Sequence, residues 1–512
     1  MREEELEREK EKTELAKRLL DRLKPFGRWR ESLLCEMIRM DATRRLIRER
    51  EPELLKRRGK EASERIYQYM KEASERYRDY ICRPFPGDRE FFYSLFVIFE
   101  RFSSLRDFIE VSSLELDLSI ERLPREVYSK ALEKTAGDGS LHIYPAGEFL
   151  EFFLECGDFI CSREIRLYPE DDSLKRLLGY LVSDCPGAEI KEWPPEVRAS
   201  DFVLGKFDGK NILSALEILP SLGKGGKLVA VLPMKILRLP EALPLRKEML
   251  GMGIERIVFP VQRFPETHAI VVFNWEHPGE EVMVETCQGE RKFPYHLLGE
   301  VSAWNPEILL FPDLKTLEKF FVYTPRITLG DVAAVEYFFW WSIDYRRACP
   351  VNRVIFSDDV VDGVIEVESL RGLPPEQEKE LITAEAGDLI ISQRKGRFRV
   401  GEVGPWEGKV FFAGPGIIIK PYRFLKRKYP FKFLRLFLES GLGKALLGSC
   451  LTSKVVHEMS EQALKKIPIP DVGEEEEINR LVSALDEERV QAEERARERK
   501  EKILENLLGW QR

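Results

Sequence analysis

Short apolar runs alternate with amphipathic segments between residues 140 and 275, and this alternation restricts the fold more than any other feature of the sequence. Each run has the length of a buried strand and is bounded by glycine, proline or polar residues. The expected strands are Leu141–Tyr144, Ile160–Leu167, Ala188–Trp193, Asp201–Leu204, Leu228–Leu232, Ile254–Pro260 and Ala269–Trp275. The expected helices are Phe149–Leu154, Leu174–Leu181, Asn211–Leu222 and Leu243–Met252. Because strands and helices alternate, this region is predicted to be an α/β domain with a parallel, Rossmann-like doubly wound sheet.

The residues before and after this region follow different patterns of apolar and charged positions. Residues 1–135 are predicted as a helical N-terminal region, because charges of both signs surround apolar positions at helical spacing. We place the α/β domain at 136–325, a β-rich α+β domain at 326–472 and a long charged helix at 473–512. Within the first part, Arg39–Lys60 holds nine basic and four acidic residues. We read this stretch as a solvated helical face, with phosphate contact as the alternative.

Composition and charge exclude several classes of protein. The chain has 512 residues, 43% of them hydrophobic, so it can bury large cores in several domains. A net charge of −8 excludes a uniformly basic nucleic-acid coat but allows a local basic patch. No apolar run approaches the roughly 20 residues that span a bilayer, and the N-terminus is charged throughout, so we expect a cytoplasmic protein without membrane contact. Six Asn and eight Gln beside abundant Lys, Arg and Glu are typical of proteins from thermophiles.

Cysteine usage gives no sign of a metal site. The eight cysteines are scattered, and none forms a CxxC pair. Cys156 and Cys161 are the closest pair, and we expect reduced core thiols there, with a metal or a disulfide as the alternatives. The sequence therefore predicts no bound metal.

The segment 201–275 carries a first family resemblance. It contains Asp-Phe-Val-Leu at 201–204, a glycine-rich turn and buried strand at 222–233, a helix at 245–250 and Arg-Phe-Pro-Glu-Thr-His-Ala-Ile-Val-Val-Phe at 263–273. This resembles the second half of the catalytic domain of N6-adenine DNA methyltransferases, of the modification-subunit type found in restriction–modification systems. The resemblance implies an S-adenosylmethionine-dependent methyltransferase fold. Another Rossmann-like domain is the alternative.

The C-terminal part carries a second resemblance. Five blocks follow an opening Ile-Thr-Leu-Gly-Asp-Val-Ala-Ala-Val at 327–335; they lie at 386–396, 399–403, 415–421, 434–443 and 464–470. This order is similar to the target recognition domain of the specificity subunits of type I restriction systems, followed by a long helix. The resemblance implies that 326–472 binds double-stranded DNA.

The first resemblance implies an S-adenosylmethionine site around residue 147, and the sequence departs from the family there. The family has Asp-Pro-x-Cys-Gly-x-Gly-x-Phe-Leu, so Pro145, Ala146 and Gly147 match only if the loop is shortened. Tyr144 stands in place of the acid, and the second glycine is missing. The family also binds ribose with an acid after its second strand, and Glu164 is the candidate for that role. A solvated surface glutamate is the alternative.

The catalytic motif is also degenerate. The family has (Asn/Asp)-Pro-Pro-(Tyr/Phe) after its fourth strand, where the polar side chain and a carbonyl accept from the adenine amino group and the ring stacks on the flipped base. Lys206, Phe207 and Asp208 occupy these positions, and the lysine ammonium can only donate. No Asn-Pro-Pro-Tyr occurs in the chain. We expect that catalytic activity has been lost. The alternative is an active site that is rearranged but functional, and only in that case would S-adenosylmethionine be the cofactor.

A basic, aromatic-rich segment lies inside the recognition-like domain. Between residues 394 and 435 there are twelve basic and two acidic residues. Basic side chains neutralise phosphates, and arginine can read guanine. A solvated basic surface over core aromatics is the alternative. The candidate DNA-binding residues are Arg394, Lys395, Arg397, Arg399, Lys420, Arg423, Lys426, Arg427 and Lys428.

These features favour a DNA-binding protein that joins a catalytically degenerate methyltransferase-like domain to one recognition domain. It would act in DNA recognition or in recruiting a partner, and the helix at 473–512 would pair two copies or contact a restriction–modification or defence subunit. One alternative is an active site-specific adenine methyltransferase. A second is a structural subunit of a defence or nucleic-acid-handling complex.

Overall fold

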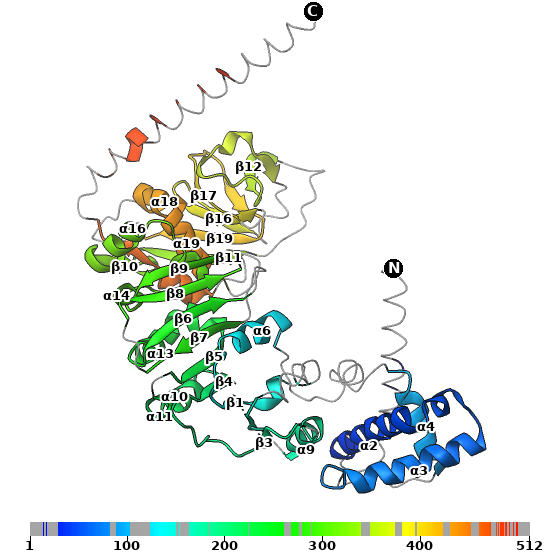
Figure 1. Cartoon of the computed structure of the whole chain (residues 1–512). Coiled ribbons are helices and arrows are strands. Elements are labelled where there is room, and N and C mark those ends of the chain that lie inside the picture. Colours follow the sequence, from blue (N-terminus) through cyan, green and yellow to red (C-terminus); the bar gives the residue numbers. More distant parts are fainter. Residues whose placement is uncertain are drawn as a thin grey trace, which may run out of the picture. The chain divides into compact units, whose positions relative to one another are not determined.

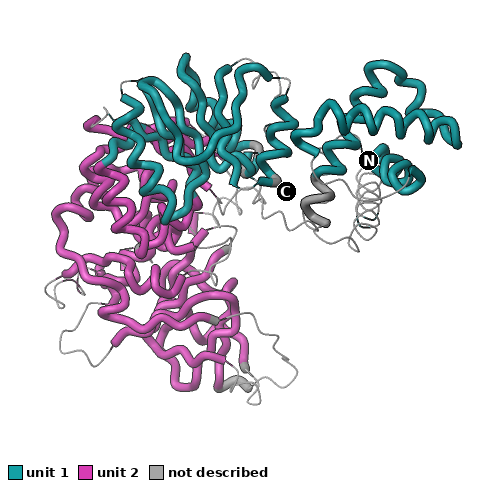
Figure 2. The backbone as a smooth tube through the Cα atoms, turned by 90° about the horizontal axis from the view of Figure 1, so that it is seen from below, with its two compact units in different colours: residues 1–232, 252–255, 270–278 teal, residues 233–251, 256–269, 279–512 magenta. Residues whose placement is uncertain are grey.

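A computed structural model gives the structure of the chain (Figure 1). It describes residues 29–81, 89–102, 123–149, 163–170, 172–183, 185–223, 225–260, 268–275, 279–287, 289–338, 349–373, 381–394, 397–422, 431–451 and 460–472, with Glu14, Lys17, Phe153 and scattered positions within 478–499. The chain forms two compact units (Figure 2). The first comprises residues 1–232, 252–255 and 270–278, and the second comprises 233–251, 256–269 and 279–512.

The N-terminal part consists of helices joined by buried ion pairs. They are α2 (Trp29–Arg50), the 3-10 helix η1 (Pro52–Lys56), α3 (Lys60–Arg76) and α4 (Arg89–Phe99). Asp41 of α2 is buried and accepts hydrogen bonds from Arg44 and Arg45, each at 2.9 Å, and from the Tyr180 hydroxyl at 3.0 Å. Tyr180 belongs to α9 (Asp172–Leu181), so this carboxylate ties the N-terminal helices to the α/β region. Arg39 and Arg44 are buried too, and part of the Arg39–Lys60 basic stretch therefore supports the fold instead of facing solvent.

A nine-stranded sheet forms the α/β region, in the order β3-β2-β1-β4-β5-β7-β6-β8-β9. The strands are β1 (Leu141–Tyr144), β2 (Ile165–Leu167), β3 (Ala188–Ile190), β4 (Phe202–Lys206), β5 (Lys227–Pro233), β6 (Ile254–Phe259), β7 (His268–Phe273), β8 (Glu281–Thr286) and β9 (Gly289–Pro294). Strands β3, β2, β1, β4 and β5 run parallel to one another, β6 is parallel to β8, and β9 is antiparallel to β8. The predicted mixed α/β fold with a large, mainly parallel sheet is confirmed.

The central strands are continuous apolar runs because both faces of the sheet are covered. Leu228–Leu232 in β5 is fully buried, as is Ala269–Val271 in β7. The covering and connecting elements are α6 (Arg125–Glu133), η2 (Ala146–Phe149), α9, α10 (Asn211–Leu216), α11 (Leu219–Leu222), α12 (Met234–Arg238), η3 (Pro240–Ala242) and α13 (Leu243–Leu250). The central strands of the sheet are thus encoded mostly by hydrophobic runs in the sequence.

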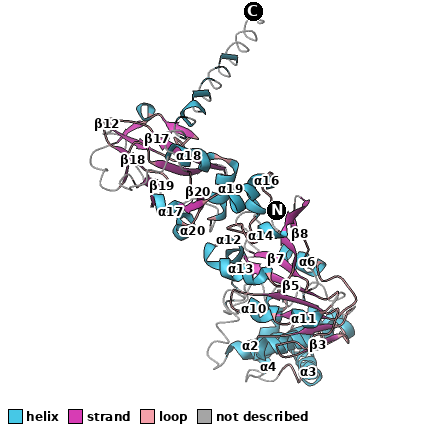
Figure 3. Ribbon diagram, turned by 90° about the vertical axis from the view of Figure 1, so that its left-hand side faces the viewer, coloured by secondary structure: helices cyan, strands magenta, loops and turns pink. Residues whose placement is uncertain are grey.

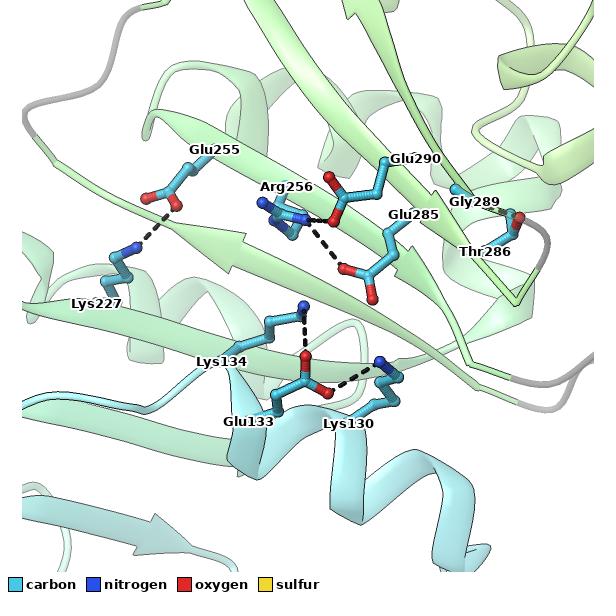
Figure 4. Close-up of polar contacts among 10 residues, drawn as sticks. All are labelled: Lys130, Glu133, Lys134, Lys227, Glu255, Arg256, Glu285, Thr286, Gly289 and Glu290. Atoms are coloured by element: carbon cyan, nitrogen blue, oxygen red, sulfur yellow. Dashed lines mark hydrogen bonds and ion pairs between the residues drawn. The ribbon is translucent and has the colours of Figure 1, made fainter.

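The hairpin β8–β9 extends the sheet where the sequence shows no clear period. Buried Val282, Val284 and Phe293 alternate with charged positions, and the ends of the strands carry ion pairs. Figure 4 shows Arg256 of β6 donating to Glu285 at 3.0 Å and to Glu290 at 2.6 Å. The figure also shows the pair of Lys227 with Glu255 at 2.7 Å and the pairs of Glu133 with Lys130 and Lys134 at 2.9 and 3.4 Å. Residues 281–294 are therefore part of the sheet, not a plain connection.

The β-rich part after residue 325 contains two packed sheets (Figure 3). Their orders are β11-β19-β16-β17-β13 and β14-β12-β18-β15, with β10 (Arg326–Thr328) and β20 (Pro468–Pro470) paired separately. The strands are β11 (Ala333–Phe338), β12 (Cys349–Ile355), β13 (Gly363–Ile365), β14 (Arg371–Leu373), β15 (Ile382–Ala384), β16 (Leu389–Arg394), β17 (Arg397–Val403), β18 (Val410–Phe412) and β19 (Gly416–Pro421). One core joins both sheets and includes Ile355, Ile390, Phe412 and Ile418.

Short helices complete the second unit. They are α14 (Tyr295–Leu298), α15 (Pro306–Leu309), α16 (Leu314–Glu318), the π-helix η4 (Lys319–Tyr323), α17 (Leu329–Val332), η6 (Val367–Ser369), α18 (Phe431–Glu439), α19 (Gly441–Ser449) and α20 (Glu461–Lys465). In the part of the chain that the structure describes, no helix is both long and apolar enough to cross a bilayer. Cys185 is disulfide-bonded, while Cys156 and Cys161 lie outside the described residues. The predicted domain boundaries stay a prediction.

Candidate functional site

The strand order places a crevice between β1 and β4. The order 3-2-1-4-5 reverses direction at this pair, and in open α/β sheets ligands bind outside the carboxyl ends of the strands at such a switch point. Tyr144 ends β1 opposite Gly205 of β4. Pro145, Ala146 and Gly147 follow β1, and Lys206, Phe207 and Asp208 end and follow β4. The structure therefore brings the predicted loop after β1 and the degenerate motif after β4 to one edge of the sheet.

Four aromatic residues gather at this edge, one at or after each of four neighbouring strands. Tyr144 ends β1, Tyr168 follows β2, Trp193 follows β3, and Phe207 follows β4. These four residues are named the ring cluster here. Because the four strands are parallel, their carboxyl ends share one edge and the rings converge there.

The rings of the cluster contact one another closely. Tyr144 and Trp193 are stacked, with centroids 4.2 Å apart and planes at 21°. Trp193 meets Tyr168 edge-on at 5.6 Å, and Phe207 lies 6.2 Å from Tyr144 and 6.4 Å from Trp193. Tyr168 and Phe207 are buried. Aromatic pairs in this distance range stabilise each other by about 0.5–1.5 kcal/mol beyond their burial, so the cluster resists separation.

Gly205 allows β1 and β4 to approach closely beneath these rings. A Cβ atom at Gly205 would lie 2.3 Å from the Tyr144 carbonyl oxygen and 2.3 Å from Cζ of Phe207. No side chain fits in that space. The glycine therefore lets the Phe207 ring fold back over the strand pair instead of facing outward.

The loop after β1 is closed by an acid that the sequence analysis missed. The Gly147 N–H donates to Oε2 of Glu170 at 3.1 Å, and a Cβ at Gly147 would lie 2.9 Å from the same oxygen. Glu170 stands three residues past the end of β2, so it is the acid after the second strand. Burial raises the pKa of the Tyr144 hydroxyl, and the negative charges of Glu170 and Asp208 raise it further. The Glu170 carboxylate therefore covers the side of Gly147 where a side chain would otherwise stand.

Glu164 does not belong to this edge. It directly precedes β2, so it lies at the amino end of the strand, away from Gly147. There it is exposed and accepts a hydrogen bond from Arg166 at 2.5 Å. The expected strand Ile160–Leu167 ends at the same residue as β2, so Glu164 lies inside it and the acid that follows its end is Glu170. The structure does not bring Glu164 together with Pro145, Ala146 and Gly147.

The degenerate motif after β4 is engaged in the fold. Phe207 is 1% exposed and its N–H donates to the Val231 carbonyl at 3.0 Å, so its ring is not available to stack on an extruded base. Oδ1 of Asp208 accepts from the backbone N–H groups of Lys210 and Asn211 at 2.9 and 2.8 Å, where it caps α10. Lys206 is half-buried and offers only donors. Lys206 therefore offers no acceptor to an adenine amino group, and one oxygen of Asp208 is already engaged with the backbone.

A buried polar chain lies beneath the ring cluster. Nε2 of His142 is 3.1 Å from Oδ2 of Asp201, and its Nδ1 is 2.8 Å from the Tyr168 hydroxyl. An ionised Asp201 only accepts, so Nε2 carries the proton and Nδ1 accepts from Tyr168. Asp201 also accepts from the N–H groups of Ser140 and Arg198. Burial lowers the pKa of His142 and raises that of Tyr168 to about 12, so both are neutral near pH 7.

The lowered pKa of His142 makes stability depend on pH. An unfolded histidine binds a proton near pH 6.5, while the folded His142 does not until the pH is lower. The free energy of unfolding should therefore be constant above about pH 6.5 and fall below it by up to about 1.4 kcal/mol per pH unit. Urea unfolding of the wild type and of His142→Gln between about pH 8 and about pH 5 measures this. A fall of equal steepness in both proteins would show that His142 is not its source.

The predicted DNA-binding residues differ in their exposure and in the protein groups that they contact. Arg397 is exposed, the Arg399 guanidinium donates to the Val360 carbonyl at 3.3 Å, and Lys420 pairs with Glu336 at 2.7 Å. Arg394 is described by its backbone alone. Outside the described residues lie Lys395, Arg423, Lys426, Arg427 and Lys428. The structure therefore does not show one continuous basic patch.

The crevice does not fit S-adenosylmethionine, and the described residues offer no metal site. The rings of the cluster stack on one another at the strand ends, and Glu170 covers the glycine that the cofactor would approach. Among the residues that the structure describes, no three His, Cys, Asp or Glu side chains are grouped as metal ligands. We therefore propose no reaction step that uses S-adenosylmethionine or a metal ion at this site.

No protein family and no curated protein matches the sequence. Among solved structures, a modification subunit assigned to a type I restriction enzyme from Vibrio vulnificus YJ016 is 14% identical, with 55% of this chain and 84% of that chain covered and a TM-score of 0.33. A structure from a type I restriction–modification system is also 14% identical, with coverages of 55% and 78% and a TM-score of 0.26. A TehB-like S-adenosylmethionine-dependent methyltransferase from Corynebacterium glutamicum is 12% identical, with coverages of 32% and 96% and a TM-score of 0.23. At these values the function has to be argued from this chain's own residues.

Proposed function

We propose that the protein binds double-stranded DNA through its C-terminal β-rich domain and does not transfer methyl groups. The observation that carries the second half of this proposal is the ring cluster, which occupies the crevice where a methyltransferase would hold its cofactor. The hydrogen bonds from two backbone N–H groups to Oδ1 of Asp208 and the burial of Phe207 support it, because both engage in the fold groups that an adenine site would use.

The DNA-binding half of the proposal rests on charge. The segment 394–435 has a surplus of ten basic residues in a chain with a net charge of −8. A basic segment on an acidic body attracts a polyanion to one place and repels it elsewhere. The two-sheet core beneath this segment is well packed and offers a rigid support for such contacts.

The charged C-terminal helix completes the proposal as a contact for a second copy or for a protein partner. Near its start Val482 is buried, and Lys432 of α18 lies 3.3 Å from the Ser483 hydroxyl, so this end is anchored. Leu485 follows Ala484 in the same helix, and its side chain is 54% exposed. An anchored helix with an accessible apolar position is suited to pairing with another helix.

Binding to labelled random-sequence duplex DNA tests the proposal. We expect log Kd to rise linearly with log salt concentration between about 50 and about 200 mM, with each phosphate contact adding about 0.9 to the slope. Fluorescence anisotropy of the full chain gives both values. The affinity should be the same with and without S-adenosylmethionine. A Kd that does not change with salt, or no binding at all, would contradict the DNA-binding half.

A further inference from the structure

Strand β3 is a free edge of the nine-stranded sheet, because in the described part of the chain it pairs with β2 alone. The Gly187 carbonyl and the Lys191 N–H form hydrogen bonds to β2, at 2.8 and 2.9 Å, so every second residue from 187 to 191 turns its backbone groups toward β2. Ala188 and Ile190 turn theirs away from the sheet. The Ala188 N–H donates to the Cys185 carbonyl at 3.0 Å, but no described residue pairs with the Ala188 carbonyl or with the N–H and carbonyl of Ile190. Three backbone groups are therefore available to an added strand.

A cavity of about 580 Å³ lies along this edge, between β3 and α9. Ala188 and Ile190 line it on the side of the strand. The residues of α9 that line it are spaced three and four positions apart, so they form one face of the helix: Asp172, Lys175, Arg176 and Gly179. Tyr80 packs against this face, since a Cβ at Gly179 would lie 2.6 Å from its ring. We name this cavity the α9 groove, and Figure 1 shows the two elements beside each other.

A helix face beside a free strand edge is suited to an extended peptide. In such sites the main chain of the peptide pairs with the edge strand, and its alternate side chains contact the neighbouring walls, which gives specificity. The α9 groove supplies both parts, because β3 offers backbone groups and α9 offers side chains.

Two cations of α9 set the charge that a ligand would meet in the groove. Lys175 is exposed and Arg176 is half-buried, and neither makes a hydrogen bond or ion pair with a residue that the structure describes. Two acids also line the groove: Asp79 has Arg78 at 3.9 Å, and Asp172 lies one turn before Lys175 on α9. The middle of the helix face therefore complements acidic side chains.

We propose that an extended acidic segment of a partner protein binds in the α9 groove as an added strand beside β3. Its main chain pairs with Ala188 and Ile190, and its acidic side chains on the helix side contact Lys175 and Arg176. This inference does not rest on the proposed DNA binding, because the groove belongs to the first compact unit and the basic segment 394–435 belongs to the second.

Fluorescence anisotropy of the full chain with a labelled peptide, acetyl-Val-Glu-Val-Asp-Val-Glu-Val-amide, tests the inference. One comparison peptide has lysine in place of each acid. The other keeps the acids but is N-methylated at alternate residues, which removes the donors along one edge of the peptide strand. We expect saturable binding of the acidic peptide and a loss of roughly tenfold or more with either comparison peptide.

Three protein variants locate the site. Ile190→Pro removes an N–H that faces away from β2, a place where an edge strand accepts proline, and should weaken binding roughly tenfold. Lys175→Glu should weaken it roughly 5- to 30-fold, because it replaces an attraction by a repulsion. Lys60→Glu is the matched control and should bind as the wild type does, since Lys60 is exposed at the start of α3 and does not line the groove.

Four results would overturn the inference. The first is no saturable binding of the acidic peptide to the wild type. The second is equal binding of the N-methylated peptide, because this is a charge contact without strand pairing. The third is an equal loss in Lys60→Glu and Lys175→Glu. The fourth is displacement of the peptide by an equal concentration of inorganic phosphate, because this is a simple anion site. The peptide comparisons use the wild type alone, and circular dichroism checks the fold of each variant.

Discussion

Replacing Asp41 by alanine should lower the free energy of unfolding by about 3–5 kcal/mol. The carboxylate is 5% exposed and accepts hydrogen bonds from Arg44, Arg45 and the Tyr180 hydroxyl. Its loss leaves the guanidinium of Arg44, itself 2% exposed, with Glu100 at 3.8 Å as its remaining charged neighbour. A buried charge that loses its partner costs far more than an exposed one. The loss also releases α2 from α9, because Tyr180 is on α9.

Glu72→Ala is the matched control for Asp41→Ala. Glu72 pairs with Arg50 at 2.8 Å in the same helical part, but both side chains are over 40% exposed, so the change should cost less than about 1 kcal/mol. Urea unfolding followed by circular dichroism compares the two, and hydrogen exchange in α9 reports the local release. Equal midpoints for the two variants would show that the Asp41 contacts do not hold these helices together.

The sheet was predictable because its strands are encoded by local hydrophobic runs. Leu228–Leu232 and Ala269–Phe273 are apolar at every position, which is what burial on both faces requires. The hairpin β8–β9 was missed because its buried residues alternate with charges over short stretches between prolines and glycines. The start of the second strand was placed too early, at Ile160 instead of Ile165, but its end at Leu167 was correct, so Glu164 was the wrong choice for an acid that follows this strand.

The ring cluster could not be predicted, although each of its members is visible in the sequence. Tyr144 and Trp193 are 49 positions apart, and only the strand order 3-2-1-4 brings them into contact. The sequence showed what the motifs lack, such as the acid replaced by Tyr144. It did not show that the replacing side chains would meet and fill the crevice. Glu170 was missed for the same reason, since its contact with Gly147 depends on how β1 and β2 are aligned.

The candidate DNA-binding residues were chosen by counting charge along the sequence, and they stay a prediction because five of the nine lie outside the described residues. The structure commits two of the described residues, Arg399 and Lys420, to protein partners. A count of charges does not contain this information.

The second large effect expected is the absence of S-adenosylmethionine binding. To admit the cofactor, Trp193 would have to leave its stack with Tyr144, and the Glu170 carboxylate would have to leave the Gly147 N–H. Tyr144 has no negative charge to offer the cofactor, because a tyrosine hydroxyl is neutral near pH 7 and burial raises its pKa further. Binding energy spent on these rearrangements does not appear as affinity. The dissociation constant should therefore be weaker than about 1 mM.

Isothermal titration of the full-length protein with S-adenosylmethionine tests the central claim most directly, that the chain's own rings close the crevice. The same preparation should bind duplex DNA, which shows that it is folded and active in binding. The claim predicts no heat of binding up to about 1 mM cofactor. A saturable heat with a Kd in the micromolar range would contradict it and would show that the crevice admits the cofactor.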